Sequence, residues 1–199
     1  MFRRLIVLAG VALLACALAA PALGVRVKVR VEGKTTTIFG PTQPALTTGP
    51  NALAALDTAS IAGEFYYHVR QTSFGPFVDQ IGLYPGAGTS GWSYKINGVS
   101  PPVGADQATL KDGDTVLWYW ATFSEQGSTP TLQIQRRGKT NCYSVASQND
   151  AGAATPAAGA VLVVDGRRVK TRSGRGCVGK HRSLVRATSP NAVRSNSVR

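Results

Sequence analysis

The sequence predicts a mostly β protein with one short helix, divided into two units. Apolar and charged residues alternate strictly over 25–32, the period-2 pattern of a strand with one face on a core and one in water. Short β-prone runs separated by Gly, Pro and Asn turns follow along most of the chain, as in all-β domains. Residues 136–199 hold thirteen Lys and Arg against two acids, whereas residues 25–135 hold seven against eight. Such a charge contrast indicates two domains.

The N-terminus has the layout of a secretory signal. Arg3 and Arg4 precede an apolar run over 5–20, which is too short to span a bilayer comfortably. Cleavage fits after Ala19 or Ala22, and a rival reading makes Cys16 the lipidated first residue of a lipoprotein. No other stretch has the roughly 20 apolar residues of a membrane helix. We therefore expect a signal peptide over 1–22 and a protein that is secreted or held at the cell surface.

A hairpin and one helix are expected to open the first unit. The turn at Glu32-Gly33-Lys34 leads from the alternating strand into a second strand over 35–39. Residues 51–62 are rich in Ala, with large apolar residues near helical spacing, and Thr48 or Asn51 is placed to cap this helix. Gly63 is expected to end it.

The rest of the first unit is predicted from turns. Residues 65–69 are β-prone, and residues 74–88, with two Pro and four Gly, are expected to form a long irregular loop holding one short strand. Asn97-Gly98 is a strong hairpin signal because both residues tolerate positive φ, and residues 111–114 form a second tight turn. The run over 115–123 is apolar on both faces, so we expect a central strand whose second face is also covered.

The second unit is expected to be a small basic β domain over 131–199, after a linker over 124–130. It is poor in apolar residues and buries little core by itself. If Cys16 leaves with the signal, Cys142 and Cys177 remain, and a disulfide between them is the simplest outcome in an oxidising compartment. Closing that loop stabilises the fold by about 4 kcal/mol on the chain-entropy model.

One stretch carries a family resemblance. The sequence runs Gly91-Trp92-Ser93-Tyr94-Lys95-Ile96-Asn97-Gly98, then Val103-Gly104-Ala105, then Leu110-Lys111-Asp112-Gly113-Asp114, with Trp118 and Trp120 in the strand that follows. In order and spacing this resembles the transcobalamin-like C-terminal domain, a β-grasp module of the soluble ligand-binding type, over residues 25–123. The resemblance implies an α+β unit with one short helix on a mixed sheet. The remainder weakly resembles an immunoglobulin-like or transthyretin-like β-sandwich.

The resemblance implies a binding scaffold without naming the ligand. In vitamin carriers this domain helps to enclose cobalamin, but the other half of the cage is a large helical domain that nothing in this chain could form. A small molecule or a peptide is therefore the expected partner. The candidate binding residues are aromatic and lie near the hairpin, the Gly/Pro-rich segment and the last strand: Trp92, Tyr94, Tyr66, Phe77, Tyr84 and Tyr119. Trp92 and Tyr94 share a strand face that fits either a stacking platform or a core.

The basic residues of the second unit form another candidate surface. Few acids accompany them, so anionic cell-envelope polymers are plausible partners outside a cell, although a generic basic surface explains them equally well. Tyr143 is the one aromatic residue among them, so specific nucleic-acid recognition is not expected. The candidate residues are Arg167, Arg168, Lys170, Arg172, Arg175, Lys180 and Arg182.

The sequence lacks two common catalytic patterns, a His pair for zinc and a nucleophile elbow. His68 and His181 are the only histidines and fall in different units, so neither unit has a His pair for zinc. No nucleophile elbow is present, and Asp112 and Asp114 are expected to project from a turn into solvent. We therefore expect no enzyme activity, no metal site and no cofactor. Two hypotheses remain: an exported binding protein acting through the aromatic residues, or a structural or adhesive protein acting through the basic surface.

Overall fold

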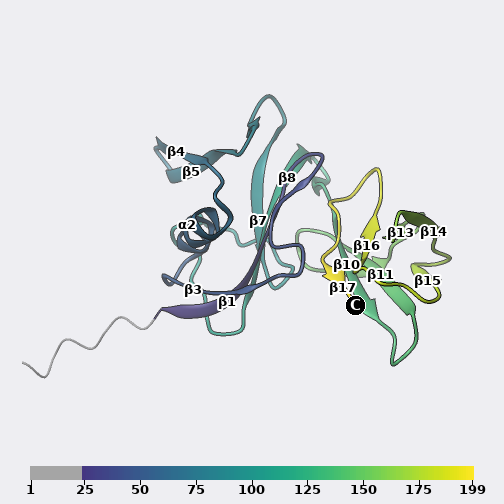
Figure 1. Cartoon of the computed structure of the whole chain (residues 1–199). Helices are drawn as coiled ribbons and strands as arrows, with labels where there is room; N and C mark the ends of the chain where they lie inside the picture. The colour runs from purple at the N-terminus through teal and green to yellow at the C-terminus, as the bar shows by residue number, and fades with distance from the viewer. Residues whose placement is uncertain (1–23) are drawn as a thin grey trace, which may run out of the picture.

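A computed structural model describes residues 24–199, which form two units side by side (Figure 1). The expected signal peptide and Cys16 lie outside the described residues. The fold is mostly β, as predicted. None of the helical structure described has the length and apolarity that a membrane crossing requires. In the first unit the elements are β1 (Val25–Glu32), β2 (Thr37–Phe39), β3 (Ala45–Thr48), α2 (Ala52–Gly63), β4 (Tyr67–Thr72), β5 (Gly75–Ile81), β6 (Tyr84–Pro85), β7 (Ser90–Ile96), β8 (Thr115–Ser124) and β9 (Gly127–Ser128).

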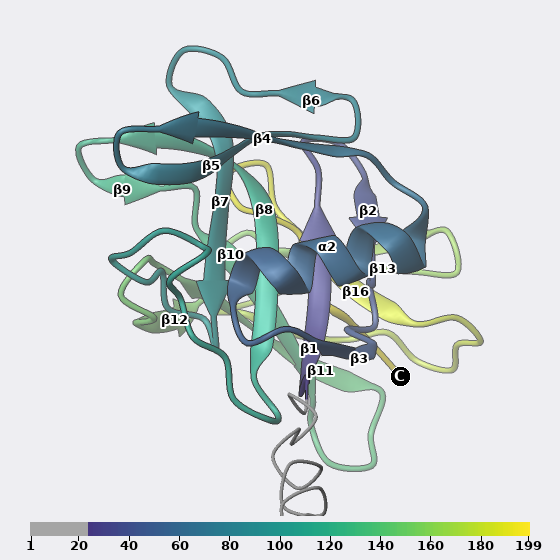
Figure 2. The same cartoon turned by 90° about the vertical axis from the view of Figure 1, so that its left-hand side faces the viewer.

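The first unit is a mixed sheet covered on one face by α2 (Figure 2). The central order is β2-β1-β8-β7, with β1 parallel to β8 and β7 antiparallel to β8. Val27, Val29 and Val31 of β1 are fully buried, and the Trp118 indole of β8 donates to the Ala52 carbonyl at 3.2 Å. The helix is therefore held on the sheet by apolar packing together with a hydrogen bond.

The predicted helix is confirmed, but it ends differently. Asn51 is the N-cap, and its side chain accepts from the Ala54 amide at 2.8 Å. The left-handed residue after the helix is Glu64, with φ 51°, and not Gly63. A Cβ at Gly63 would lie 2.6 Å from the Phe39 ring. The glycine is needed for close packing against β2 rather than for a left-handed backbone.

The expectation of a long irregular loop at 74–88 is wrong. β4, β5 and β6 form a three-stranded antiparallel sheet above the end of α2 (Figure 2). Its first hairpin turns at Thr72, whose hydroxyl accepts from the Phe74 amide at 3.1 Å and donates to the Gly75 carbonyl at 2.8 Å. Gly75 has φ +102°. The Gly and Pro residues thus form tight turns between strands.

The second unit packs two sheets around its own core. Its elements are β10 (Thr131–Arg136), β11 (Cys142–Gln148), β12 (Ala154–Pro156), β13 (Val161–Val164), β14 (Arg167–Lys170), β15 (Arg175–Cys177), β16 (Val185–Thr188) and β17 (Ser197–Val198). One sheet has the order β10-β11-β12 with β15 beside β11, and the other has the order β14-β13-β16-β17. The predicted Cys142–Cys177 disulfide is present and joins β11 to β15. Residues 124–130, expected as a linker, instead form a hairpin in which β9 pairs with the end of β8.

The second unit covers the outer face of the first sheet. Leu117, Tyr119 and Ala121 of β8 are buried together with Val193, which explains why β8 is apolar on both faces. The alternation in β1 does not predict burial here, since the charged residues Arg30 and Glu32 are 2% and 0% exposed. Both were expected to face water.

A cluster of four charged residues lies at the contact between the two units. The Glu32 carboxylate lies 3.3 Å from the Arg30 guanidinium, 3.1 Å from Arg194 and in contact with Arg186. It also accepts from the Thr37 hydroxyl at 3.0 Å. Burial lowers the pKa of Arg30 to about 10, against the opposing effect of Glu32. One buried anion is therefore surrounded by three cations, and two of those come from the second unit.

A second buried charge lies at the other end of the contact. The Lys95 ammonium is 0% exposed and donates to the carbonyls of Gln148 at 3.2 Å and Asn149 at 2.8 Å. Asp150 lies 3.8 Å away and accepts from both the amide and the hydroxyl of Ser128. Burial lowers the pKa of Lys95, against the opposing effect of Asp150.

We expect Glu32→Gln to destabilise the protein by about 3–5 kcal/mol, because it leaves buried arginines without their anion. Urea denaturation monitored by tryptophan fluorescence measures this loss. Glu125→Gln is the control, since Glu125 is exposed. Equal midpoints for the two variants would show that the cluster contributes nothing to stability.

The double variant Cys142→Ser/Cys177→Ser should have a free energy of unfolding about 4 kcal/mol lower than the parent. Without the bond, the unfolded chain gains the entropy that closing a loop between residues 35 positions apart had removed. Thermal unfolding of this variant and of the oxidised parent measures the difference. A reductant should lower the melting temperature of the parent and leave that of the double variant unchanged. A melting temperature shared by all samples would contradict the prediction.

Candidate functional site

An aromatic cleft of about 270 Å³ lies at the outer edge of β7. β5 forms one wall and the loop over 103–105 forms the other. Its lining is mostly apolar and comes from four separate segments: Pro76, Phe77, Val78, Trp92, Ser93, Tyr94, Val103, Gly104, Ala105, Trp118 and Phe123. Trp92 and Tyr94 project to one face of β7 and Ser93 projects to the other. Because the cleft contacts residues from both faces of β7, it lies along the edge of this strand and not over one face of the sheet.

The register of β7 orients its backbone groups toward this cleft. The Asn97 amide donates to the Thr115 carbonyl at 2.9 Å, and the Phe123 amide donates to the Thr89 carbonyl at 2.8 Å. The odd-numbered residues of β7 are therefore the ones bonded to β8. The N–H and C=O groups of Trp92 and Tyr94 point away from β8, on a side where no other strand is paired in the part of the chain described.

Local bridges occupy both ends of this edge. Ser90 exchanges hydrogen bonds with Ala87, and Ile96 exchanges hydrogen bonds with Val99. The part of the edge between the two bridges, centred on Trp92 and Tyr94, borders the cleft. We refer to residues 91–95 as the β7 edge. It is long enough to pair with three or four residues of an added strand.

Trp92 and Tyr94 are held firmly, and they differ in exposure. Trp92 is 3% exposed; its indole donates to the Tyr84 carbonyl at 2.9 Å and meets the Trp120 ring edge-on at 5.8 Å. The half-buried Tyr94 donates its hydroxyl to the Val103 carbonyl at 2.7 Å. Burial, with Asp106 nearby, raises the pKa of Tyr94 to about 12. Trp92 belongs largely to the core, whereas Tyr94 is a fixed wall of the cleft.

The remaining predicted aromatic residues separate into two groups. Phe77 lines the cleft and is 45% exposed. Tyr66 is 60% exposed and lies outside the lining. Tyr84 bonds the Thr35 hydroxyl at 2.8 Å, and Tyr119 is 0% exposed on the opposite face of the sheet, where the second unit covers it. The structure therefore brings together three of the six.

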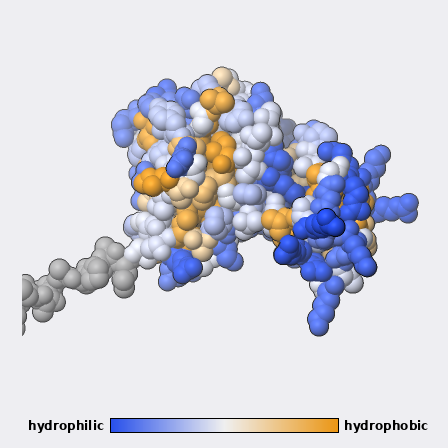
Figure 3. Space-filling view, in the orientation of Figure 1, coloured by the Kyte–Doolittle hydropathy of each residue, from blue (hydrophilic) through white to orange (hydrophobic). Residues whose placement is uncertain are grey.

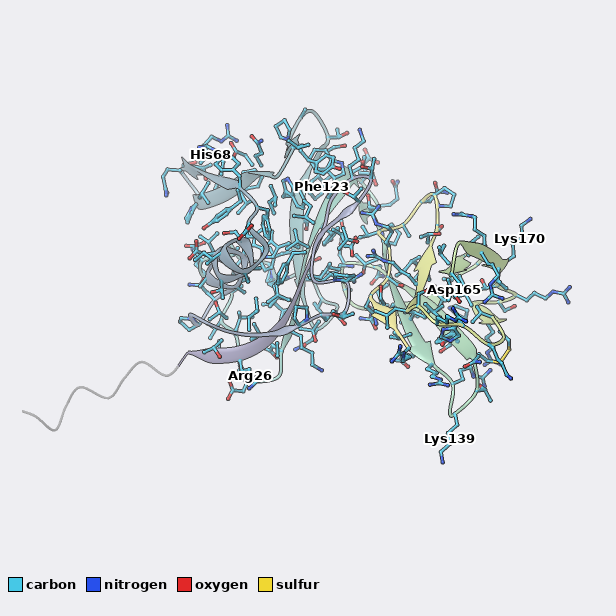
Figure 4. The ribbon with its side chains drawn as sticks, viewed as in Figure 1. Arg26, His68, Phe123, Lys139, Asp165 and Lys170 are labelled. Atoms are coloured by element: carbon cyan, nitrogen blue, oxygen red, sulfur yellow. A yellow bond between two sulfur atoms is a disulfide. The ribbon has the colours of Figure 1, made fainter. Side chains whose placement is uncertain are left out.

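Other lining residues were missed by sequence reasoning. Trp118 and Phe123 lie in the strand whose apolar character was noted, but their shared cavity depends on the edge position of β7. Val103 and Pro76 come from segments far apart in the chain, and only the fold brings them together. Phe123 lies near the upper end of the central strands (Figure 4).

The seven predicted basic residues are all exposed, and hydrophilic side chains dominate the surface of the second unit (Figure 3). They come from β14, the turn into β15, the first residue of β15 and the loop before β16. Asp165 organises part of this surface, since it accepts from the Ser183 hydroxyl and from the amides of Arg182 and Ser183. These hydrogen bonds lower the pKa of Asp165 to about 2.

The acidic residues of the 111–114 turn and His68 interact with residues close to them in the fold. Asp112 accepts from the Arg26 amide at 2.7 Å, and Asp114 accepts from Asn97 and from the Lys111 amide, so these side chains stabilise their turns instead of simply facing solvent. His68 lies 2.6 Å from Asp79 on the exposed β4–β5 surface (Figure 4). Over residues 24–199 no group of three or more His, Cys, Asp or Glu side chains is close enough to hold a metal ion.

Part of this chain is similar to a described family. Residues 52–122, from α2 to β8, match the domain of unknown function DUF4430. The fold is also similar to the crystal structure of "a putative metal binding protein" from Ruminococcus gnavus ATCC 29149, with 14% identity and a TM-score of 0.38, over 49% of this chain and 97% of that one. No curated protein matches the chain. The matched family segment includes α2, β5, β7 and both walls of the aromatic cleft.

Proposed function

We propose that this chain is an exported, non-enzymatic binding protein whose first unit is transcobalamin-like and captures an extended peptide at the β7 edge. The observation that carries the proposal is that outward-facing backbone groups and an apolar cleft occur at the same place. An added strand bonds its main chain to an open sheet edge and inserts alternate side chains into pockets. The rigid positions of Trp92 and Tyr94 reduce the entropy cost of binding.

The size and chemistry of the cleft define the peptide. A space of about 270 Å³ with an apolar lining suits one large side chain, such as Phe, Leu or Trp. Phe77 and Val103, which are 45% and 44% exposed, stand at the two sides and lose water on binding. A small aromatic molecule would fill the same space but leave the backbone groups of the edge without partners. Cobalamin is too large for this cleft.

Export is supported by the signal-like N-terminus and by the Cys142–Cys177 disulfide. The alternative hypothesis, adhesion to anionic envelope polymers through the basic surface, is supported by the many exposed cations of the second unit. The two functions use different surfaces, and only the second predicts that binding weakens strongly as salt is added.

The test measures binding of labelled seven-residue peptides, alternating Thr and Val around a central Phe, Leu or Trp, to the mature chain by fluorescence anisotropy. Phe77→Ala should weaken the best of them about tenfold, the effect of losing one well-packed aromatic contact. Phe74→Ala is the matched control, since Phe74 lies on the same hairpin, is 92% exposed and does not line the cleft.

N-methylation separates strand addition from capture of a side chain alone. Methyl groups on the amides that face β7 should abolish binding, whereas methyl groups on the alternate amides should leave it intact. If N-acetyl-phenylalanine amide binds as tightly as the peptides, the proposal of an extended peptide ligand is contradicted and a small-molecule ligand is favoured. Salt should change the affinity little. Binding that disappears in high salt would favour the alternative hypothesis.

A further inference from the structure

Three surface hollows meet on the outer face of the sheet β10-β11-β12. A hollow of about 340 Å³ lies over β10, β11 and β15, one of about 320 Å³ lies in the crevice between the two units, and one of about 530 Å³ lies beside the β10–β11 turn. Gln135 lines all three. Gln133 joins the first to the second, and Ser144 joins the first to the third. The three hollows are therefore neighbours on this surface, and we refer to them together as the glutamine trough.

The strand pattern explains which side chains of β10 and β11 face this trough. Leu132, Ile134, Tyr143 and Val145 point into the core of the second unit, so their neighbours on β10 and β11 point outward. Gly174 closes the trough at β15, because a Cβ there would lie 2.5 Å from the Val145 carbonyl. Only glycine lets the chain approach the sheet so closely at that point.

The lining matches a chain of hydroxyl groups that also bears negative charge. Its side-chain amides, among them Gln43, Gln133 and Gln135, each donate and accept hydrogen bonds, as sugar hydroxyls require. None of the residues that line the three hollows is acidic, while Arg175, Arg136 and Arg137 stand along the first and third. Arg136 is fixed by the carbonyls of Thr140 and Lys139.

From this geometry we infer that the glutamine trough binds an anionic polysaccharide. The amides recognise hydroxyls, and the arginines pair with carboxylate or sulfate groups along the chain. A polyphosphate or a nucleic acid offers mainly phosphate acceptors to the amides, and the trough lining has no aromatic residue for stacking a base. The inference does not depend on peptide binding, since the trough shares no residue with the aromatic cleft. It gives the basic unit a defined site in place of a diffuse charged surface.

Isothermal titration of the mature chain with hexagalacturonate tests the inference at about 150 mM salt, where the Debye length is about 8 Å and diffuse attraction is weak. The double variant Gln133→Ala/Gln135→Ala changes no charge and should weaken binding at least fivefold. Arg175→Gln should weaken it at least fivefold as well. Arg182→Gln removes the same charge from an exposed residue outside the trough and should change the affinity less than twofold.

The further arms decide the ligand class. Inorganic hexaphosphate and single-stranded oligothymidine should bind more weakly than hexagalacturonate, and cellohexaose, which has hydroxyls but no charge, should bind weakly and lose its affinity in the glutamine variant. Phe77→Ala should leave hexagalacturonate binding unchanged. The inference is overturned if hexagalacturonate shows no saturable binding, if the two arginine variants lose affinity equally, or if the glutamine variant, still folded by its melting curve, binds as the parent does.

Discussion

The burial of Glu32 between three arginines is the constraint on which the rest of the structure depends. Its carboxylate belongs to β1, while Arg186 and Arg194 belong to the second unit. Removing these charges from water costs several kcal/mol per ion, and only close pairing of opposite charges offsets that cost. The two units are therefore held in one geometry, because any rotation would separate buried charges.

Coverage of β8 follows from that geometry. With the second unit seated on the sheet, Leu117 and Tyr119 are removed from water on one face while Trp118 packs under α2 on the other. At the far end of the same contact, the Lys95 ammonium donates to the carbonyls of Gln148 and Asn149 in the second unit. The central strand is thus fixed from both sides, and β7 is left as the edge.

The candidate sites arise from the boundaries of the packed layers. The aromatic cleft exists because β5, the β7 edge and the loop over 103–105 come together at the boundary of the sheet. The glutamine trough exists because the outer face of β10 and β11 lies beside the first unit. One surface is apolar with main-chain groups, and the other is polar and cationic, so each suits a different class of partner.

Sequence patterns alone determined the mostly β class, a short helix predicted over 51–62, a central strand predicted over 115–123 and the pairing of Cys142 with Cys177. The helix, the strands and the turns depend on periodicity and turn residues, which short stretches of sequence contain. The disulfide follows from the number of cysteines. Tertiary structure alone decided that Arg30 and Glu32 are buried, that Tyr119 is covered while Tyr94 borders a cleft, and that residues 75–81 and 84–85 form strands. Burial depends on what packs over a face, and segments distant in the chain supply that cover.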